Sequence, residues 1–223
     1  MRMRRKKHLE ERLLEAGKYL VFTESDEFYS LPEEERFRYI DRKVIFGKEA
    51  PLLLEIGCGK GKFSCETARR NPDKQVIGVE KLSNVIVEAL EQAKKEDLKN
   101  CAFLNCDAQN LGYYLKEKSV ESVFLNFSSP YPKNTYKNRR LTNPSFLRLF
   151  HKLLVPGGRI FFKTDNRKFF EYSLLSFNEC GFRLKDISLD LHADDYPDNI
   201  VTEYEKNFVD RGYTIYYAEV EAV

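Results

Sequence analysis

The sequence lacks the features that would place it in a membrane, around a metal ion or in a disulfide-linked fold. No apolar run approaches the roughly 18 residues of a membrane-spanning helix. The charged amino terminus has no apolar stretch behind it, so no secretory signal is predicted. Five cysteines form no C-x-x-C pair and there are only three histidines, so no zinc ligand set is predicted. We therefore expect a cytoplasmic protein without a metal, whose thiols are reduced and mostly buried.

The net charge is also small, at +2 for 223 residues, but the charges are unevenly distributed. Basic residues cluster in residues 2–7 and in residues 133–140, whereas residues 190–205 are rich in Asp and Glu. This uneven distribution of charge suits a protein that binds a polyanion with one surface and binds a cationic group, or one rich in hydrogen-bond donors, with another. A solvated basic tail is the alternative interpretation of residues 2–7.

The length and the 42% hydrophobic content suit one well-buried domain. Leucine spacing predicts a helix over residues 9–16, and the proline-led segment 32–46 predicts a second one. From residue 52 onward, short apolar runs alternate with amphipathic stretches, which predicts an α/β fold with a parallel, doubly wound sheet. The β-rich runs 182–191 and 214–220 have no convincing helix between them and predict an antiparallel pair at one sheet edge.

A strand-like run at residues 52–56 leads directly into a loop that contains Gly57, Gly59 and Gly61. Glycine permits sharp turns and the close approach of a ligand, which is typical of nucleotide-cofactor loops that open into a helix. A dinucleotide fingerprint is G-x-G-x-x-G, whereas this loop is G-x-G-x-G with Glu55 two places before the first glycine. A carboxylate there suits a cationic ligand better than a pyrophosphate. A plain strand-to-helix turn, or another nucleotide, is the alternative.

Two further acids end strand-like runs, Glu80 after residues 75–79 and Asp107 after residues 101–106. Ligands of an open parallel sheet bind at the carboxyl ends of its strands, so these acids are expected at the cofactor site. An acid about twenty residues after the glycine loop accepts hydrogen bonds from ribose hydroxyls, and Glu80 has this spacing. Asp107 would by analogy receive the adenine amino group. An exposed strand-end carboxylate is the alternative for either acid.

A longer resemblance begins where the fourth predicted strand ends. Residues 125–133 read LNFSSPYPK and continue as NTYKNRRLT. This segment resembles the F-S-D-P-W-P-K-x-R-H-x-K-R-R-L-T signature of bacterial tRNA (guanine-N(7)-)-methyltransferases. KTDNR at 163–167, SLDLH at 188–192 and NIVTEYE at 199–205 are similar to later motifs of that family, in the same order. The resemblance extends from about residue 40 to the end of the chain.

The resemblance implies a Rossmann-like, class I S-adenosylmethionine-dependent methyltransferase domain at 47–223, preceded by a basic N-terminal arm and added helices at 1–46. Its sheet would be mostly parallel and seven-stranded, with helices on both faces and an antiparallel C-terminal strand pair. The implied reaction transfers a methyl group from S-adenosyl-L-methionine to N(7) of a variable-loop guanine in tRNA. It would proceed by direct in-line displacement, without a metal or a covalent enzyme intermediate, in a monomer or a homodimer.

The resemblance also assigns roles to individual residues. Those implied at the cofactor are Glu55, Gly57, Gly59, Gly61, Glu80, Asp107 and Ser129. Those implied at the guanine are Lys133, Asp165, Thr202, Glu203, Tyr204 and Glu205. Those implied at tRNA phosphates are Lys137, Arg139 and Arg140. The chemistry agrees, because a flipped guanine offers N–H donors that a carboxylate accepts in a fork, and its ring gains positive charge on methylation. Each acid taken alone fits a surface carboxylate or a helix cap better than a substrate contact.

The chain departs from the family signature where the reaction would occur. Ser129 stands at the position of the family's proposed catalytic aspartate, and Tyr131 at that of its tryptophan. Guanine N(7) already carries a free lone pair, so no general base is needed and alignment with the methyl group supplies much of the acceleration. We expect activity, with Ser129 and Asp165 at the catalytic centre and Asp165 among the acids that stabilise the developing positive charge. Thr135 and Tyr136 replace the usual Arg and His, which predicts a weaker phosphate grip.

Two other functions remain open from the sequence. The chain could be an RNA-binding or cofactor-sensing module that keeps the fold and has lost catalysis through Ser129. It could also methylate a small molecule, in which case the basic clusters would be incidental. Charge reversal at Arg139 and Arg140 discriminates the latter, because phosphate contacts dominate RNA affinity.

Overall fold

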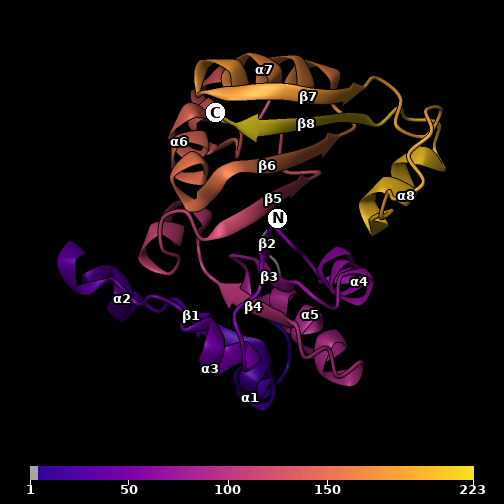
Figure 1. The fold of residues 1–223 in the computed structure, drawn as a ribbon. Coiled ribbons are helices and arrows are strands. Elements are labelled where there is room, and N and C mark those ends of the chain that lie inside the picture. Colours follow the sequence, from indigo (N-terminus) through magenta and orange to yellow (C-terminus); the bar gives the residue numbers. More distant parts are fainter. Residues whose placement is uncertain (1–4) are drawn as a thin grey trace. The chain divides into compact units, whose positions relative to one another are not determined.

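The computed structural model describes residues 5–223, which divide into two compact units, one ending at Lys116 and one spanning Glu117–Val223 (Figure 1). Arg2 and Arg4 of the predicted basic arm lie outside the described residues. The predicted boundary between residues 46 and 47 falls inside the first unit. Every helix within residues 5–223 is too short or too polar to cross a membrane.

The first unit is built on four parallel strands in the order β1-β4-β3-β2. The strands are β1 (Leu20–Thr23), β2 (Leu52–Ile56), β3 (Gln75–Val79) and β4 (Cys101–Asn105). Its helices are α1 (Leu9–Glu15), α2 (Asp26–Ser30), α3 (Arg42–Phe46), α4 (Lys62–Arg70) and α5 (Ser83–Lys95), with short 3-10 turns η1 (Gly17–Tyr19), η2 (Glu33–Glu35) and η3 (Ala108–Tyr113). Every residue of β2, β3 and β4 is buried, as expected of apolar strands covered on both faces.

The second unit has the strand order β5-β6-β8-β7, in which β5 and β6 are parallel and β8 is antiparallel to both of its neighbours. The strands are β5 (Val120–Asn126), β6 (Leu154–Thr164), β7 (Phe182–Ser188) and β8 (Tyr216–Ala222). Its helices are α6 (Pro144–Leu153), α7 (Arg167–Glu179) and α8 (Glu203–Val209), with a 3-10 turn η4 (Asn134–Arg139). The side chains of Asn143 and Asn166 cap α6 and α7 by accepting backbone N–H groups.

The predicted α/β class is confirmed, including the antiparallel pair near the carboxyl terminus, but three elements differ. The described residues form eight strands rather than seven, because β1 pairs with β4. Segment 32–46 is not one helix. The backbone N–H groups of Arg38 and Ile40 instead donate to the carbonyls of Tyr113 and Tyr114, and α3 begins only where Asp41 caps it. Helix α8 also lies between β7 and β8, where no helix was expected.

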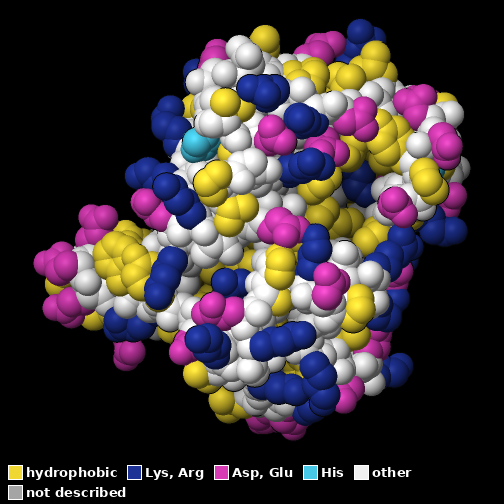
Figure 2. Space-filling view, in the orientation of Figure 1, with side chains coloured by type: hydrophobic (Ala, Val, Ile, Leu, Met, Phe, Trp, Pro, Cys, Tyr) yellow, Lys and Arg dark blue, Asp and Glu magenta, His cyan; other side chains and the backbone are white. Residues whose placement is uncertain are grey.

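The surface in Figure 2 has hydrophobic side chains gathered over α2, with acidic side chains around them. Tyr29, Phe37 and Tyr39 are each nearly half exposed in this part of the first unit. The acids belong to α2 and η2. Elsewhere in the view, Lys and Arg are interspersed with Asp and Glu.

Candidate active site

The glycine loop between β2 and α4 holds all three glycines at positive φ, 77° at Gly57, 56° at Gly59 and 78° at Gly61. The N–H groups of Gly57 and Cys58 both donate to the carbonyl of Val79, at 2.8 and 2.9 Å, so the loop is tied to the end of β3. A Cβ at Gly57 or Gly59 would meet nothing within 4 Å, whereas one at Gly61 would lie 2.5 Å from Cβ of Ala89 in α5. The loop therefore offers open space along its first half and tight helix packing at its end.

Glu55 and Glu80 both support this loop. Glu55 is only 3% exposed, and its carboxylate accepts a hydrogen bond from the hydroxyl of Ser64 in α4 at 2.5 Å. The carboxylate of Glu80 accepts from the backbone N–H of Gly59 at 3.3 Å and from that of Leu82 at 2.9 Å. Glu80 thus lies against the open part of the loop, while Glu55 connects β2 to α4.

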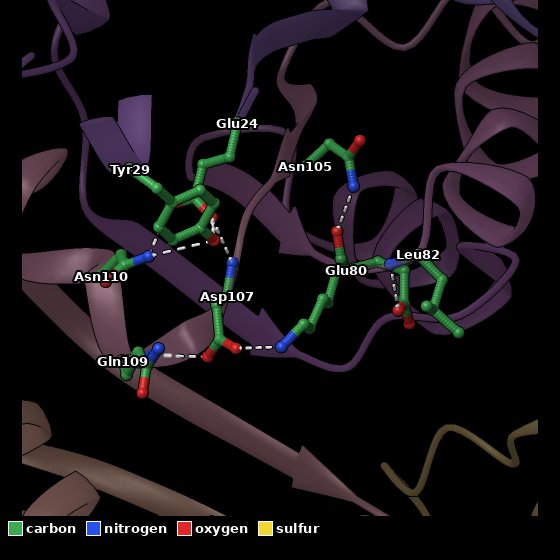
Figure 3. A network of polar contacts seen from close by, with 9 residues as sticks. Glu24, Tyr29, Glu80, Leu82, Asn105, Asp107, Gln109 and Asn110 are labelled. Carbon is green, nitrogen blue, oxygen red and sulfur yellow. Dashed lines mark hydrogen bonds and ion pairs between the residues drawn. The ribbon is translucent and has the colours of Figure 1, made fainter. Parts of the chain in front are cut away.

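Asp107 lies two residues after β4, before η3, and takes part in a network of polar contacts (Figure 3). Its carboxylate accepts from the backbone N–H of Gln109 at 3.1 Å, which caps η3, and pairs with the ammonium of Lys81. Its own backbone N–H donates to Glu24 at 3.0 Å. Glu24 was not predicted as a site residue, because it follows a short strand that the apolar pattern did not indicate.

In the second unit, the proline-containing loop 127–133 is held by Arg140. The guanidinium of Arg140 donates to the carbonyls of Pro130 and Tyr131, at 2.9 and 3.0 Å, and lies 4.3 Å from the ring centroid of Tyr172. Phe127 and Tyr131 have positive φ, 52° and 40°, a conformation that non-glycine residues rarely adopt. A strained loop of this kind is found at ligand sites whose surroundings fix the backbone.

The two arginines next to this loop differ in exposure. Arg140 is 9% exposed, and its guanidinium donates to carbonyls inside the protein; its predicted phosphate contact stays a prediction. Arg139 is exposed, and its guanidinium lies 5.0 Å from the ring centroid of Tyr136. Lys133 and Lys137 are exposed as well, as is Ser129. The hydroxyl of Ser128 is buried and has no hydrogen-bond partner among residues 5–223.

Glu205 is the centre of a buried polar cluster in the second unit. It is 0% exposed, and its carboxylate accepts from Lys163 Nζ at 2.7 Å and Asn199 Nδ2 at 2.6 Å, and lies 2.9 Å from His192 Nε2. Glu205 and Thr202 also form a capping box at the start of α8. Burial opposes the charged form of Glu205, but Lys163 and the hydrogen bonds outweigh it and lower its pKa. Lys163, His192 and Asn199 lie in the motifs noted above, yet their convergence on Glu205 was not predicted.

The remaining residues predicted at the guanine are more accessible. Glu203 is exposed, and Tyr204 in the first turn of α8 is 67% exposed. Asp165 follows β6 and is half-buried, and among the described residues its carboxylate has no hydrogen-bond or ion-pair partner. Asp165, Glu203 and Tyr204 therefore keep their polar groups available for a ligand, whereas Thr202 and Glu205 are used inside the protein. Over residues 5–223, no group of three His, Cys, Asp or Glu is placed to hold a metal ion.

The parallel strands, the glycine loop and the acids at the strand ends define a class I methyltransferase fold. A solved 16S rRNA methyltransferase, KamB, has the same fold, with a TM-score of 0.64 and 15% identity over 83% of this chain and 94% of that one. The family model described as "Putative methyltransferase" matches residues 49–218.

Curated relatives show which family of class I methyltransferases the chain belongs to. A tRNA (guanine-N(7)-)-methyltransferase of Geobacillus sp. (strain WCH70) is 41% identical over 99% of this chain and 96% of the relative. One of Bacillus cytotoxicus is 40% identical over 99% of this chain and 97% of the relative. The chain belongs to the tRNA (guanine-N(7)-)-methyltransferase family, as the motifs predicted.

Proposed function

We propose that this protein transfers the methyl group of S-adenosyl-L-methionine to N(7) of a variable-loop guanine in tRNA. The observation that carries the proposal is the 41% identity to a curated tRNA (guanine-N(7)-)-methyltransferase over nearly the whole of both chains. The exposed basic residues Lys133, Lys137 and Arg139 support an RNA substrate rather than a small molecule. Its place of action would be the cytoplasm, as a monomer or a homodimer.

The residues of the first unit fit the proposed cofactor. Gly57 and Gly59 leave space beside the backbone, Glu80 lies against the same loop, and Asp107 follows β4, the strand that pairs with β3. Glu80 would accept hydrogen bonds from the ribose hydroxyls, Asp107 from the adenine amino group, and Glu55 would place negative charge near the sulfonium. When bound, S-adenosylmethionine supplies an electrophilic methyl group on a positively charged sulfur.

The residues proposed for the guanine belong to the second unit. Asp165 is half-buried without a donor from the described residues, and Glu203 is exposed at the start of a helix that Thr202 and Glu205 fix in place. Their carboxylates would accept the N–H donors of the base and offset the charge that develops on its ring. Tyr204 offers an exposed ring for stacking.

Ser129 fits a reaction that needs no general base. Guanine N(7) attacks with its own lone pair, so the protein's task is to align base and methyl group and to keep the loop rigid. The hydrogen bonds from Arg140 to the carbonyls of Pro130 and Tyr131 help to fix the loop. The buried hydroxyl of Ser128, which has no partner within residues 5–223, would gain one from a bound ligand.

The test incubates the purified protein with methyl-labelled S-adenosylmethionine and unmodified tRNA, then maps the label by nuclease digestion and by the chain cleavage that N(7)-methylguanine permits. We expect label at a variable-loop guanine, and its loss in Asp165→Asn. Cofactor binding by calorimetry without label on any tRNA would favour a binding module that lost catalysis through Ser129. In that case Ser129→Asp should restore transfer.

A further inference from the structure

Glu24 follows β1 and collects four hydrogen-bond donors on one carboxylate. Figure 3 shows those from Asp107, Tyr29 and Asn110. Oε2 accepts from the backbone N–H of Asp107 at 3.0 Å and from the hydroxyl of Tyr29 at 2.5 Å. Oε1 accepts from Asn110 Nδ2 and from the hydroxyl of Tyr114, both at 2.9 Å. Among the described residues Glu24 has no basic partner, so these neutral donors alone offset its charge.

These donors remain in place across the working pH range. Tyr114 and Asn110 are 1% and 8% exposed, so each would be left with a buried polar group if Glu24 were removed. Burial and the nearby Glu24 carboxylate raise the pKa of both Tyr29 and Tyr114, which keeps their hydroxyls protonated. Both hydroxyls are therefore available as hydrogen-bond donors to Glu24 near neutral pH.

The bond to Asp107 differs from the other three because it acts on the backbone. A hydrogen bond to that N–H fixes the peptide plane from which the Asp107 side chain projects. The carboxylate is then oriented by Gln109 N–H at 3.1 Å and by Lys81. Its side chain is only 16% exposed, so a small rotation of the peptide would change which carboxylate oxygen lone pair faces a ligand.

The attachment of α2 to the first unit does not depend on Glu24 alone, because aromatic packing contributes to it as well. Phe28 stacks on Tyr114 with ring centroids 5.7 Å apart, and Phe22 lies 5.1 Å from Tyr114. Phe28 is 4% exposed, so this apolar contact already holds α2 against the first unit. The carboxylate of Glu24 is thus available to serve the placement of Asp107.

We propose that Glu24 is a positioning residue for cofactor selectivity, which acts through the backbone of Asp107 so that its carboxylate meets a base with an exocyclic amino group. The inference rests on the proposed role of Asp107 at the adenine. An adenine donates an N–H to this carboxylate, whereas a 6-oxo base presents an acceptor that the carboxylate repels. Selectivity between the two bases therefore reports the orientation of Asp107 directly.

The experiment measures, by calorimetry, the affinities of S-adenosylhomocysteine and of its deaminated counterpart with a hypoxanthine base. The quantity compared is their ratio. In Glu24→Gln, an NH2 group replaces one carboxylate oxygen and cannot accept the hydrogen bonds made to that oxygen. We expect the ratio of the two affinities to fall roughly fivefold, as for one misplaced hydrogen bond. Glu27→Gln, an exposed acid on α2, is the matched control and should keep the ratio of the unaltered protein.

Asp107→Asn separates this inference from the one on which it rests. Its amide can donate to a 6-oxo group, so the preference for adenine should vanish or invert. A preference unchanged in Asp107→Asn would refute the adenine role of Asp107 itself. The proposal fails if Asp107→Asn loses the preference for adenine while Glu24→Gln keeps it. In that case Glu24→Gln would lower the affinities for the two ligands equally, or reduce only the melting temperature, and Glu24 would be merely structural. Should Glu24→Gln not fold, Tyr29→Phe removes one of the four donors and is judged by the same ratio.

Discussion

At the scale of single residues, two glutamates of the same motif differ in burial and in their partners. Glu203 and Glu205 are two positions apart, yet the first is exposed and the second is 0% exposed among Lys163, His192 and Asn199. Sequence similarity marked both as substrate residues, because a motif carries residue types and not burial. The helical turn separates them, since only one of the two can face β6.

The acid stability of the protein should depend on Glu205. Its lowered pKa means that its stabilising contribution is complete above the ordinary carboxyl pKa of 4.5 and is lost as pH falls below that value toward the folded pKa. Glu205→Gln should cost roughly 3–5 kcal/mol of unfolding free energy at neutral pH, because it removes the carboxylate that offsets the charge of the buried Lys163 ammonium. Urea unfolding from about pH 7 to pH 3 measures this, and the deficit of the variant should shrink on acidification.

The control for this prediction is Glu203→Gln. It removes one carboxylate of α8 from the solvent-exposed side and should leave the unfolding curves close to those of the unaltered protein. A deficit for Glu205→Gln that stays constant across the pH range would contradict the assigned charge state.

At the scale of elements, η4 and the loop before it bring two neighbouring arginines to different environments. Arg140 donates to loop carbonyls and packs on Tyr172, whereas Arg139 is exposed beside Tyr136. The acid-free run predicted a basic surface here but could not tell which arginine reaches it. That distinction follows from the end of η4 at Arg139, which turns the next side chain inward.

The two arginines should separate catalysis from RNA binding. Arg140→Lys replaces a planar fork with a compact ammonium that loses the two-point geometry and the stacking on Tyr172. The methylation rate constant kcat should therefore fall roughly tenfold or more as the loop shifts. The salt dependence of tRNA affinity should stay unchanged. Arg139→Ala should instead weaken tRNA binding and reduce the slope of log affinity against log salt by about one. Filter binding at several salt concentrations, with single-turnover kinetics, measures both; a reversed pattern would refute the assignment.

The glycine loop supports a similar separation of roles between Gly59 and Gly61. Gly61→Ala should destabilise the protein by at least roughly 3 kcal/mol, because its Cβ would lie 2.5 Å from Ala89 Cβ and its φ is 78°. Gly59→Ala meets only the cost of its positive φ, about 1–2 kcal/mol, but places a methyl group in the open space proposed for the cofactor. Chemical unfolding and calorimetric titration with S-adenosylhomocysteine distinguish them. Equal losses of stability in both variants would contradict this account of the loop.

At the scale of the whole molecule, alternating apolar runs and glycine spacing predicted most of the strands and helices of both units. Regular packing imposes periodic patterns, so β2 to β8 could be anticipated from residue types. Two exceptions are β1 and the segment 32–46, whose conformations depend on distant parts of the chain, such as the pairing of Arg38 and Ile40 with Tyr113 and Tyr114. The third is α8, although the capping box of Thr202 and Glu205 is a local signal for its start. The roles of Glu24 and Lys163 escaped prediction because they too depend on distant parts of the chain.

The boundary at Lys116 separates the site residues by their proposed roles. Glu55, Glu80 and Asp107, assigned to the methyl donor, precede it, while those assigned to the guanine and the phosphates follow it. Mutations confined to residues 117–223 should therefore alter the proposed nucleic-acid contacts without changing the residues proposed for the methyl donor. Ser129 is the exception. It is predicted to contact S-adenosylmethionine, yet it belongs to the unit whose other site residues are predicted to contact tRNA. A substitution at Ser129 should therefore affect both cofactor and tRNA specificity.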